Sequence, residues 1–193
     1  MDFDKTLSNI IDGYELQYGI IYGNENIVFI KCGAGGTIPG YEDRYLKLAH
    51  NLHKRSGATV ICSAYPYPSD DFLLEYDEEI INKLITKFKS SYTLKFIGVS
   101  RGAYIGLTYL SKRFYFTQML LVNMPLMINY HKSIDRLSEL LNTKILFVYG
   151  DQDPSVTYIP YLKLHHNNVM IINGADHNFK GMLDEFVALA ELL

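Results

Sequence analysis

Short apolar runs alternate with segments of helical periodicity along most of this 193-residue chain, and this alternation constrains the fold more than any other feature. Runs that are apolar throughout are typical of strands buried on both faces, whereas apolar residues three and four positions apart indicate one face of a helix. The pattern predicts strands at residues 58–62, 94–99, 118–123, 144–150 and 168–173. It predicts helices at residues 41–55, 74–88, 103–112, 134–141, 158–165 and 178–193.

Strands that alternate with helices favour a mostly parallel sheet, because each helix returns the chain to the same end of the sheet. We therefore expect an α/β fold built as a three-layer α/β/α sandwich. Two β-rich runs near the start, residues 14–22 and 26–32, are separated by a turn-like break at residues 23–25. This break predicts a hairpin that forms an antiparallel N-terminal edge.

Length and composition favour one globular domain over residues 1–193 with a small-molecule partner. Hydrophobic residues make up 48% and charged residues 20%, and no apolar run reaches the length that spans a bilayer. The net charge of -3 provides no basic surface for phosphates, so nucleic acid is not an expected partner. The start MDFDKTLSNIIDGYEL lacks the basic and apolar regions of a secretory signal. We therefore expect a cytoplasmic protein without membrane insertion.

The two cysteines, Cys32 and Cys62, each end an apolar, strand-like run. Two thiols cannot supply the four ligands of a structural metal site, and free cysteine is usually buried. We expect both thiols to be reduced and buried, and we expect neither a metal nor another cofactor.

Reactive side chains follow three of the predicted strands. Ser100 comes directly after one strand, Asp151 and Asp153 come after a second, and Asp176 and His177 come after the last. The carboxyl ends of parallel strands meet at one edge of the sheet, which is where ligands bind in such folds. A serine hydroxyl is a weak nucleophile at neutral pH and needs a base that is oriented by a third group. The residue types needed for such a site therefore meet at this edge.

Gly98 and Gly102 flank Ser100 in the segment GVSRG. Where a strand turns at once into a helix, the nucleophile is held in a strained backbone conformation, and side chains two positions away would collide with neighbouring chain. Glycine removes those side chains. A helix that begins near Arg101 also directs its first N–H groups toward the space above Ser100, where an oxyanion would form.

These residues resemble the α/β-hydrolase superfamily, in order and over nearly the whole chain. The family pattern G-x-S-x-G is matched by residues 98–102, and the acid pattern G-x-x-D-x-x-V by GDQDPSV at residues 150–156. The family histidine follows the last strand, as in GADHNF at residues 174–179. The resemblance implies Ser100 as nucleophile, Asp153 as acid and His177 as base.

Other residues compete for the acid and base roles. Asp151 is the reserve for the acid, although its position also suits a loop or cap residue. Asp176 is adjacent to His177 in the chain and would reach that ring with difficulty. His131 also follows a strand, but it precedes the acid and so breaks the family order. Asn123 occupies the place where some family members carry the acid, and it cannot supply a carboxylate.

The resemblance also implies an oxyanion hole made of two main-chain N–H groups. One belongs to Arg101, and the other to the loop CGAGG, where Ala34 is the candidate and Gly35 its rival because the usual histidine is absent. Gly35 is also a candidate substrate contact, since glycine lets backbone approach a ligand. Met124 and Met127 are further candidates for lining an acyl or alcohol pocket. They lie in residues 123–143, a stretch too short for a separate cap domain.

Together these parts predict a small cap-less serine hydrolase. Its substrate would be a carboxylic ester or thioester of a small molecule, cleaved through an acyl-enzyme on Ser100 without a cofactor. An acyltransferase that uses the same three residues is one alternative. A non-catalytic ligand-binding or interaction protein on the same fold is another, because a fold does not fix a function. The intact serine, acid and histidine favour an enzyme.

Overall fold

The computed structural model describes residues 1–11, 13–66, 70–88 and 91–193. Within these residues eight strands form one sheet in the order β1-β2-β4-β3-β5-β6-β7-β8. The strands are β1 (Lys5–Ile11), β2 (Tyr14–Ile21), β3 (Asn24–Lys31), β4 (Ala58–Ser63), β5 (Thr93–Val99), β6 (Gln118–Val122), β7 (Lys144–Gly150) and β8 (Val169–Ile172). The pairs β1–β2 and β2–β4 are antiparallel and the other pairs are parallel. The predicted mostly parallel sheet with an antiparallel N-terminal edge is confirmed.

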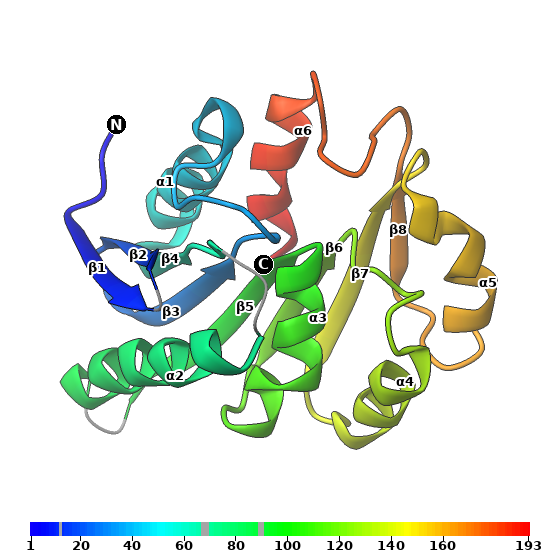
Figure 1. Cartoon of the computed structure of the whole chain (residues 1–193), viewed down its shortest axis with the longest axis horizontal. Coiled ribbons are helices and arrows are strands. Elements are labelled where there is room, and N and C mark those ends of the chain that lie inside the picture. The colour runs from blue at the N-terminus through cyan, green and yellow to red at the C-terminus, as the bar shows by residue number, and fades with distance from the viewer. Residues whose placement is uncertain (12, 67–69, 89–90) are drawn as a thin grey trace.

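Six α-helices in the same residues pack around this sheet (Figure 1). They are α1 (Arg44–Ser56), α2 (Asp70–Lys87), α3 (Arg101–Thr108), α4 (Tyr130–Glu139), α5 (Ile159–Leu162) and α6 (Leu183–Ala188). Short 3₁₀ turns occur at Tyr41–Asp43, Leu110–Lys112, Pro154–Tyr158 and Leu189–Leu192. Helices α1 and α6 pack together on one face, and α3 and α4 pack together on the other (Figure 1). The three-layer α/β/α architecture is therefore confirmed.

The predicted hairpin between residues 14–22 and 26–32 is wrong. These runs form β2 and β3, but β4 lies between them in the sheet. Because β4 pairs with both β2 and β3, the break carries the chain across the position of β4. There the N–H of Gly23 donates to Oγ1 of Thr59 at 3.0 Å. The antiparallel edge is instead formed by β2 with β4 and with β1, an outer strand that the sequence pattern did not reveal.

Strand β1 escaped prediction because its sequence KTLSNII has neither a continuous apolar run nor strict alternation. It lies at the edge of the sheet, where β2 is its partner. Ile10 is 80% exposed. Such a strand is stabilised by its hydrogen-bonded neighbour more than by burial, and a pattern of apolar residues does not report that partner.

Both cysteines are free, buried thiols, as predicted. Burial raises the pKa of Cys32 to about 12 and raises the pKa of Cys62 well above its ordinary value. Both groups therefore stay protonated at neutral pH and are poor nucleophiles. In the described ranges, none of the helices combines the length and the apolar character that crossing a bilayer requires.

A fully buried ion pair lies in the interior near the end of β3. Nζ of Lys31 lies 2.8 Å from Oδ2 of Asp77 on α2, and both side chains are fully buried. Lys31 Nζ also donates to Oγ of Ser63 at 2.9 Å and to the carbonyl of Ala64 at 3.1 Å. The hydroxyls of Ser63 and Tyr18 donate to the other oxygen of Asp77 at 2.6 and 3.1 Å. This network links α2 to β3, the strand that leads into the glycine-rich loop at residues 33–36.

We expect Asp77→Ala to lower the free energy of unfolding by about 3–5 kcal/mol, because it leaves the Lys31 ammonium buried without a counter-charge. Urea unfolding followed by far-ultraviolet circular dichroism measures this loss. The double variant Lys31→Met/Asp77→Leu removes both charges and should recover most of it. Glu79→Ala breaks only the exposed pair with Lys83 on the same helix and should cost less than about 1 kcal/mol. Equal losses in Asp77→Ala and Glu79→Ala would contradict this account.

Candidate active site

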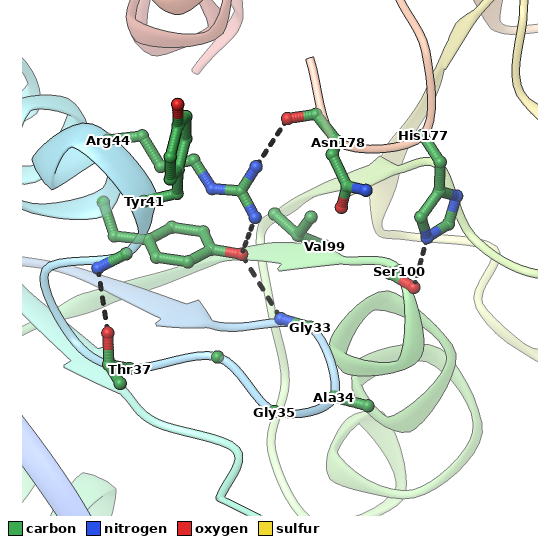
Figure 2. Close-up of a pocket in the computed structure, with 13 residues that line it drawn as sticks. Gly33, Ala34, Gly35, Thr37, Tyr41, Arg44, Val99, Ser100, His177 and Asn178 are labelled. Carbon is green, nitrogen blue, oxygen red and sulfur yellow. Dashed lines mark hydrogen bonds between the residues drawn. The ribbon is translucent and has the colours of Figure 1, made fainter. Parts of the chain in front are cut away.

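Ser100 lies on the turn between β5 and α3, at the edge where the parallel strands end. Its backbone has φ 52° and ψ -123°, a conformation that residues other than glycine rarely adopt. Neighbouring chain holds the turn in place. The N–H of Ser100 donates to the carbonyl of Val122 at 2.8 Å, and the carbonyl of Ser100 accepts the N–H of Ala103 at 3.0 Å. This conformation directs the Ser100 side chain toward His177 (Figure 2).

The space around Gly98 and Gly102 explains why both positions are glycine. A Cβ at Gly98 would lie 2.4 Å from Cα of Ala103, and a Cβ at Gly102 would lie 2.4 Å from the carbonyl oxygen of Cys32. Real Cβ atoms essentially never approach other atoms within 3.0 Å. The two glycines therefore let α3 begin directly against β5 and against the end of β3, as the sequence analysis predicted.

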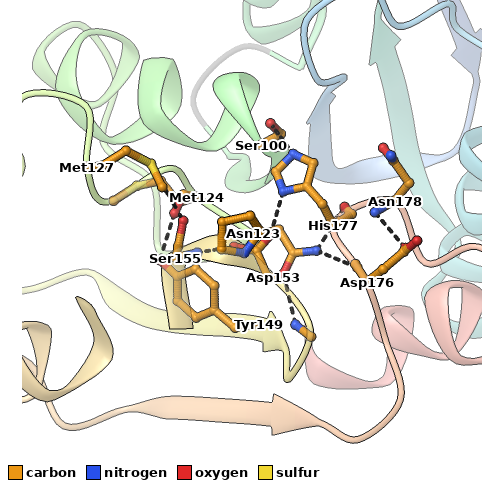
Figure 3. A network of polar contacts seen from close by, with 12 residues as sticks. Ser100, Asn123, Met124, Met127, Tyr149, Asp153, Ser155, Asp176, His177 and Asn178 are labelled. Carbon is orange, nitrogen blue, oxygen red and sulfur yellow. Dashed lines mark hydrogen bonds and ion pairs between the residues drawn. The ribbon is translucent and has the colours of Figure 1, made fainter. Parts of the chain in front are cut away.

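His177 lies in the loop after β8, between Ser100 and Asp153 (Figure 3). Its Nε2 is 2.8 Å from Oγ of Ser100, and its Nδ1 is 2.5 Å from Oδ2 of Asp153. Asp153 is 3% exposed, and its other oxygen accepts the N–H of Ser155 at 2.7 Å. A carboxylate fixed in this way favours a proton on Nδ1, which leaves Nε2 free to accept the serine proton. The structure thus brings together the three residues that the sequence motifs singled out.

The competing residues have other contacts. Oδ1 of Asp151 accepts the N–H of Gly174 at 2.8 Å, which joins the loops after β7 and β8. Oδ1 of Asp176 accepts the N–H of Lys180 at 2.9 Å, and this hydrogen bond holds the pKa of Asp176 below its ordinary value. His131 lines a separate surface hollow on α4. Asp153 is the residue whose carboxylate meets the His177 ring.

Asn123 has a structural role that sequence reasoning missed. It follows β6 with φ 46° and is fully buried. Its Nδ2 donates to the carbonyls of His177 and Asp176 at 2.9 and 3.2 Å, and its Oδ1 accepts the N–H of Gly150 at 2.9 Å (Figure 3). One amide therefore joins the end of β7, which leads into the acid, to the loop that carries the base. A carboxylate could not replace it, because it has no N–H to donate. The available signal was a polar residue at the end of an apolar strand.

A cavity of about 300 Å³ opens beside Ser100 and His177 (Figure 2). Its lining residues are Gly33, Ala34, Gly35, Gly36, Thr37, Gly40, Tyr41, Arg44, Tyr45, Val99, Ser100, His177 and Asn178. The loop after β3 lies against the nucleophile, since a Cβ at Gly33 would be 3.3 Å from Cβ of Ser100. Ala34 and Gly35 therefore border the cavity, and Arg101 begins α3 directly after Ser100. In the part of the chain that the structure describes, no group of three or more His, Cys, Asp or Glu residues could hold a metal ion.

The two methionines suggested as substrate contacts lie behind the acid rather than at the cavity. Met124 is fully buried, and its carbonyl accepts the hydroxyl of Tyr149 at 3.0 Å. Met127 is 45% exposed, and its sulfur lies 3.9 Å from Oγ of Ser155 (Figure 3). Neither is among the described residues that line the cavity at Ser100. Their positions in this cavity's surroundings therefore give no support to a role in substrate binding.

No protein-family model and no curated protein matches this sequence. Solved structures match along nearly the full length. An α/β serine hydrolase homologue from Coxiella burnetii is 19% identical, with 98% of this chain and 97% of that chain covered and a TM-score of 0.73. An α/β serine hydrolase without a lid from Xanthomonas campestris is 16% identical, with 97% and 92% covered and a TM-score of 0.70. The thioesterase domain of the curacin biosynthetic pathway is 13% identical, with 97% and 98% covered and a TM-score of 0.71.

These similarities show that the chain has the α/β-hydrolase fold, as the sequence motifs indicated. The agreement extends from the first strand to the last helix, because nearly all of each chain is covered. At such low identity the similarity establishes the fold, and the function has to be argued from the site.

Proposed function

We propose that this protein is a serine hydrolase that cleaves a carboxylic ester or thioester of a small molecule through an acyl-enzyme on Ser100. The observation that carries this proposal is the unbroken series of hydrogen bonds from Ser100 through His177 to the buried Asp153. A serine beside an oriented base is the arrangement that nucleophilic catalysis requires. The fold, which is shared with serine hydrolases and a thioesterase domain, supports the same reaction class.

The proposed reaction follows from the order of these contacts. His177 takes the proton of the Ser100 hydroxyl as Oγ bonds to the substrate carbonyl carbon, and Asp153 stabilises the imidazolium that forms. The main-chain N–H groups of Ala34 and Arg101 would stabilise the oxyanion, and each such donor contributes about 10²–10³ in rate. His177 then gives its proton to the leaving alcohol or thiol. A water that His177 deprotonates finally releases the acid and restores Ser100.

We also propose that the chain acts as one domain without a cap. The connection from β6 to β7 contains α4 and no second group of strands or helices among its described residues. A substrate would then reach Ser100 directly from solvent through the cavity beside it. Access would not depend on the opening of a lid.

Steady-state turnover of 4-nitrophenyl esters and acyl thioesters of graded acyl length tests the proposal. We expect hydrolysis that depends on Ser100, with kcat/KM highest for short acyl groups because the cavity measures about 300 Å³. An acyltransferase would instead form a new ester when small alcohols are added. A non-catalytic binding protein would show no turnover above that of Ser100→Ala with any member of the series.

A further inference from the structure

Arg44, the first residue of α1, places a cation on the wall of the cavity that holds Ser100 (Figure 2). Its Nη1 donates to the carbonyl of Asn178 at 2.6 Å, and its Nη2 donates to the hydroxyl of Tyr45 at 3.3 Å. The guanidinium carbon lies 4.9 Å from the centre of the Tyr45 ring and 5.2 Å from the centre of the Phe186 ring. These contacts fix the position of the guanidinium at the cavity.

The contacts described for the Arg44 guanidinium are with neutral groups. None of the ion pairs among the described residues includes Arg44. Its Nε is buried and has no hydrogen-bond partner in the described part of the chain. A guanidinium has five N–H donors, and the two hydrogen bonds above use two of them. A partly buried cation without a counter-charge is costly, and an anion bound in the cavity would supply that charge and accept hydrogen bonds from the remaining Nη hydrogens.

The other lining residues strengthen this electrostatic preference. None of the described lining residues carries a carboxylate, and Asp153 lies behind the His177 ring. The polar side chains of Thr37 and Asn178 line the cavity, whereas its aliphatic side chains are Ala34 and Val99. Although the net charge of the chain is -3, the cavity places the Arg44 cation beside the candidate nucleophile Ser100. This lining suits a short, charged molecule better than a long acyl chain.

An adjoining hollow continues the same surface outward. It shares Tyr41, Arg44 and Asn178 with the cavity and adds Lys180 and Asp176. The Asp176 carboxylate already accepts the main-chain N–H groups of Asn178 and Lys180, both at 2.9 Å. Lys180 thus places a second cation near the cavity entrance. The carboxylate of Asp176 already accepts main-chain N–H groups of the protein itself.

We propose that the substrate carries a carboxylate that Arg44 binds while the ester or thioester carbonyl lies at Ser100. This inference rests on the proposed function and narrows its substrate class to small anionic esters or thioesters. A carboxylate can accept two parallel hydrogen bonds from one guanidinium, which gives both affinity and orientation. A neutral carboxamide of the same shape lacks the charge and offers one acceptor oxygen in place of two, because its NH₂ group can only donate. Arg44 would therefore discriminate between the two.

Two matched pairs of substrates test this discrimination. The first pair is 3-carboxyphenyl acetate and 3-carbamoylphenyl acetate, which place the charge on the alcohol side. The second is the 4-nitrophenyl monoester of adipic acid and its terminal carboxamide, which place it on the acyl side. We expect kcat/KM to be about tenfold or more higher for the carboxylate in at least one pair, as a charge-assisted hydrogen bond predicts. Equal values in both pairs would overturn the proposal.

Variants of Arg44 connect that preference to the guanidinium. Arg44→Gln should bring the carboxylate-to-carboxamide ratio of kcat/KM to about one, and Arg44→Lys should keep part of it. Because the ratio compares two substrates in one variant, a general loss of kcat/KM caused by losing the hydrogen bond from Arg44 to Asn178 cancels. Arg55→Gln removes an arginine of the same helix that pairs with Glu191, and it should keep the parent ratio. A preference that survives in Arg44→Gln would contradict the assignment.

Binding to Ser100→Ala separates this inference from the proposed function. The variant keeps Arg44, so calorimetry should show about tenfold tighter binding of the carboxylate than of the carboxamide in the preferred pair. That result without any Ser100-dependent turnover would support the anion site and contradict the hydrolase. Turnover of both members with equal Kd values in both pairs would support the hydrolase and overturn the anion site.

Discussion

Ser100→Ala is expected to lower kcat for ester hydrolysis by about 10⁶-fold, the loss typical of removing the nucleophile from a serine-histidine-acid unit. The lost Oγ is the atom that would bond to the substrate carbonyl, and it lies 2.8 Å from Nε2 of His177. His177→Ala should cost nearly as much, and the double variant little more, because the residues act as one unit. Steady-state assays on the parent and the three variants measure these losses.

The control for this comparison is Ser138→Ala. Ser138 lies exposed on α4, where its hydroxyl donates to the carbonyl of Asp135. The Ser138→Ala variant should keep the turnover number of the parent protein. Matching circular dichroism spectra and thermal unfolding would show that Ser100→Ala remains folded, since alanine adopts the strained turn about as well as serine does. If folded Ser100→Ala keeps kcat within tenfold of the parent, the nucleophile has been misassigned.

Asp153→Asn is expected to lower kcat by about 10⁴-fold. The N–H of Ser155 donates to one oxygen of Asp153, so the amide oxygen of asparagine should stay there and its NH₂ should face Nδ1 of His177. The imidazole would then carry its proton on Nε2, where it could not accept the proton of Ser100. The fold should change little, because the substitution keeps the shape of the side chain. Steady-state kinetics and thermal unfolding together separate the two effects.

Asp151→Asn is the matched control, since it makes the same chemical change two residues earlier. Asp151 accepts the N–H of Gly174, and an amide oxygen can do the same. We expect its kcat to stay within a few-fold of the parent. Similar losses in the two variants would show that the acid has been assigned to the wrong aspartate.

The fold could be predicted because its signals are local. Strands β5, β6 and β7 are apolar runs of the length that a sheet covered on both faces requires, and helical periodicity marks α1 and α3 between strands. The positions of Ser100, Asp153 and His177 could also be predicted, because each follows a strand and parallel strands end at one edge. Their catalytic roles remain a prediction.

What the sequence did not reveal depends on contacts between distant segments. Arg44 and Asn178 are 134 positions apart, and no periodicity connects them. Asn123 could be recognised only as lacking a carboxylate, because its side-chain hydrogen bonds reach the end of β7 and the loop after β8. The hairpin prediction failed for the same reason. A turn-like break shows only that the chain changes direction, whereas the strand that lies between β2 and β3 is β4, which comes later in the chain. Met124 and Met127 matched a pocket by chemistry, but the described contacts of these two residues are with Tyr149 and Ser155.

Covalent labelling with a fluorophosphonate, followed by peptide mass spectrometry, tests most directly whether Ser100 is an activated nucleophile. We expect one phosphonylated residue per chain, located at Ser100, with no adduct in Ser100→Ala and strongly slowed labelling in His177→Ala. A folded parent protein that stays unlabelled, or labelling that persists in Ser100→Ala, would contradict this expectation.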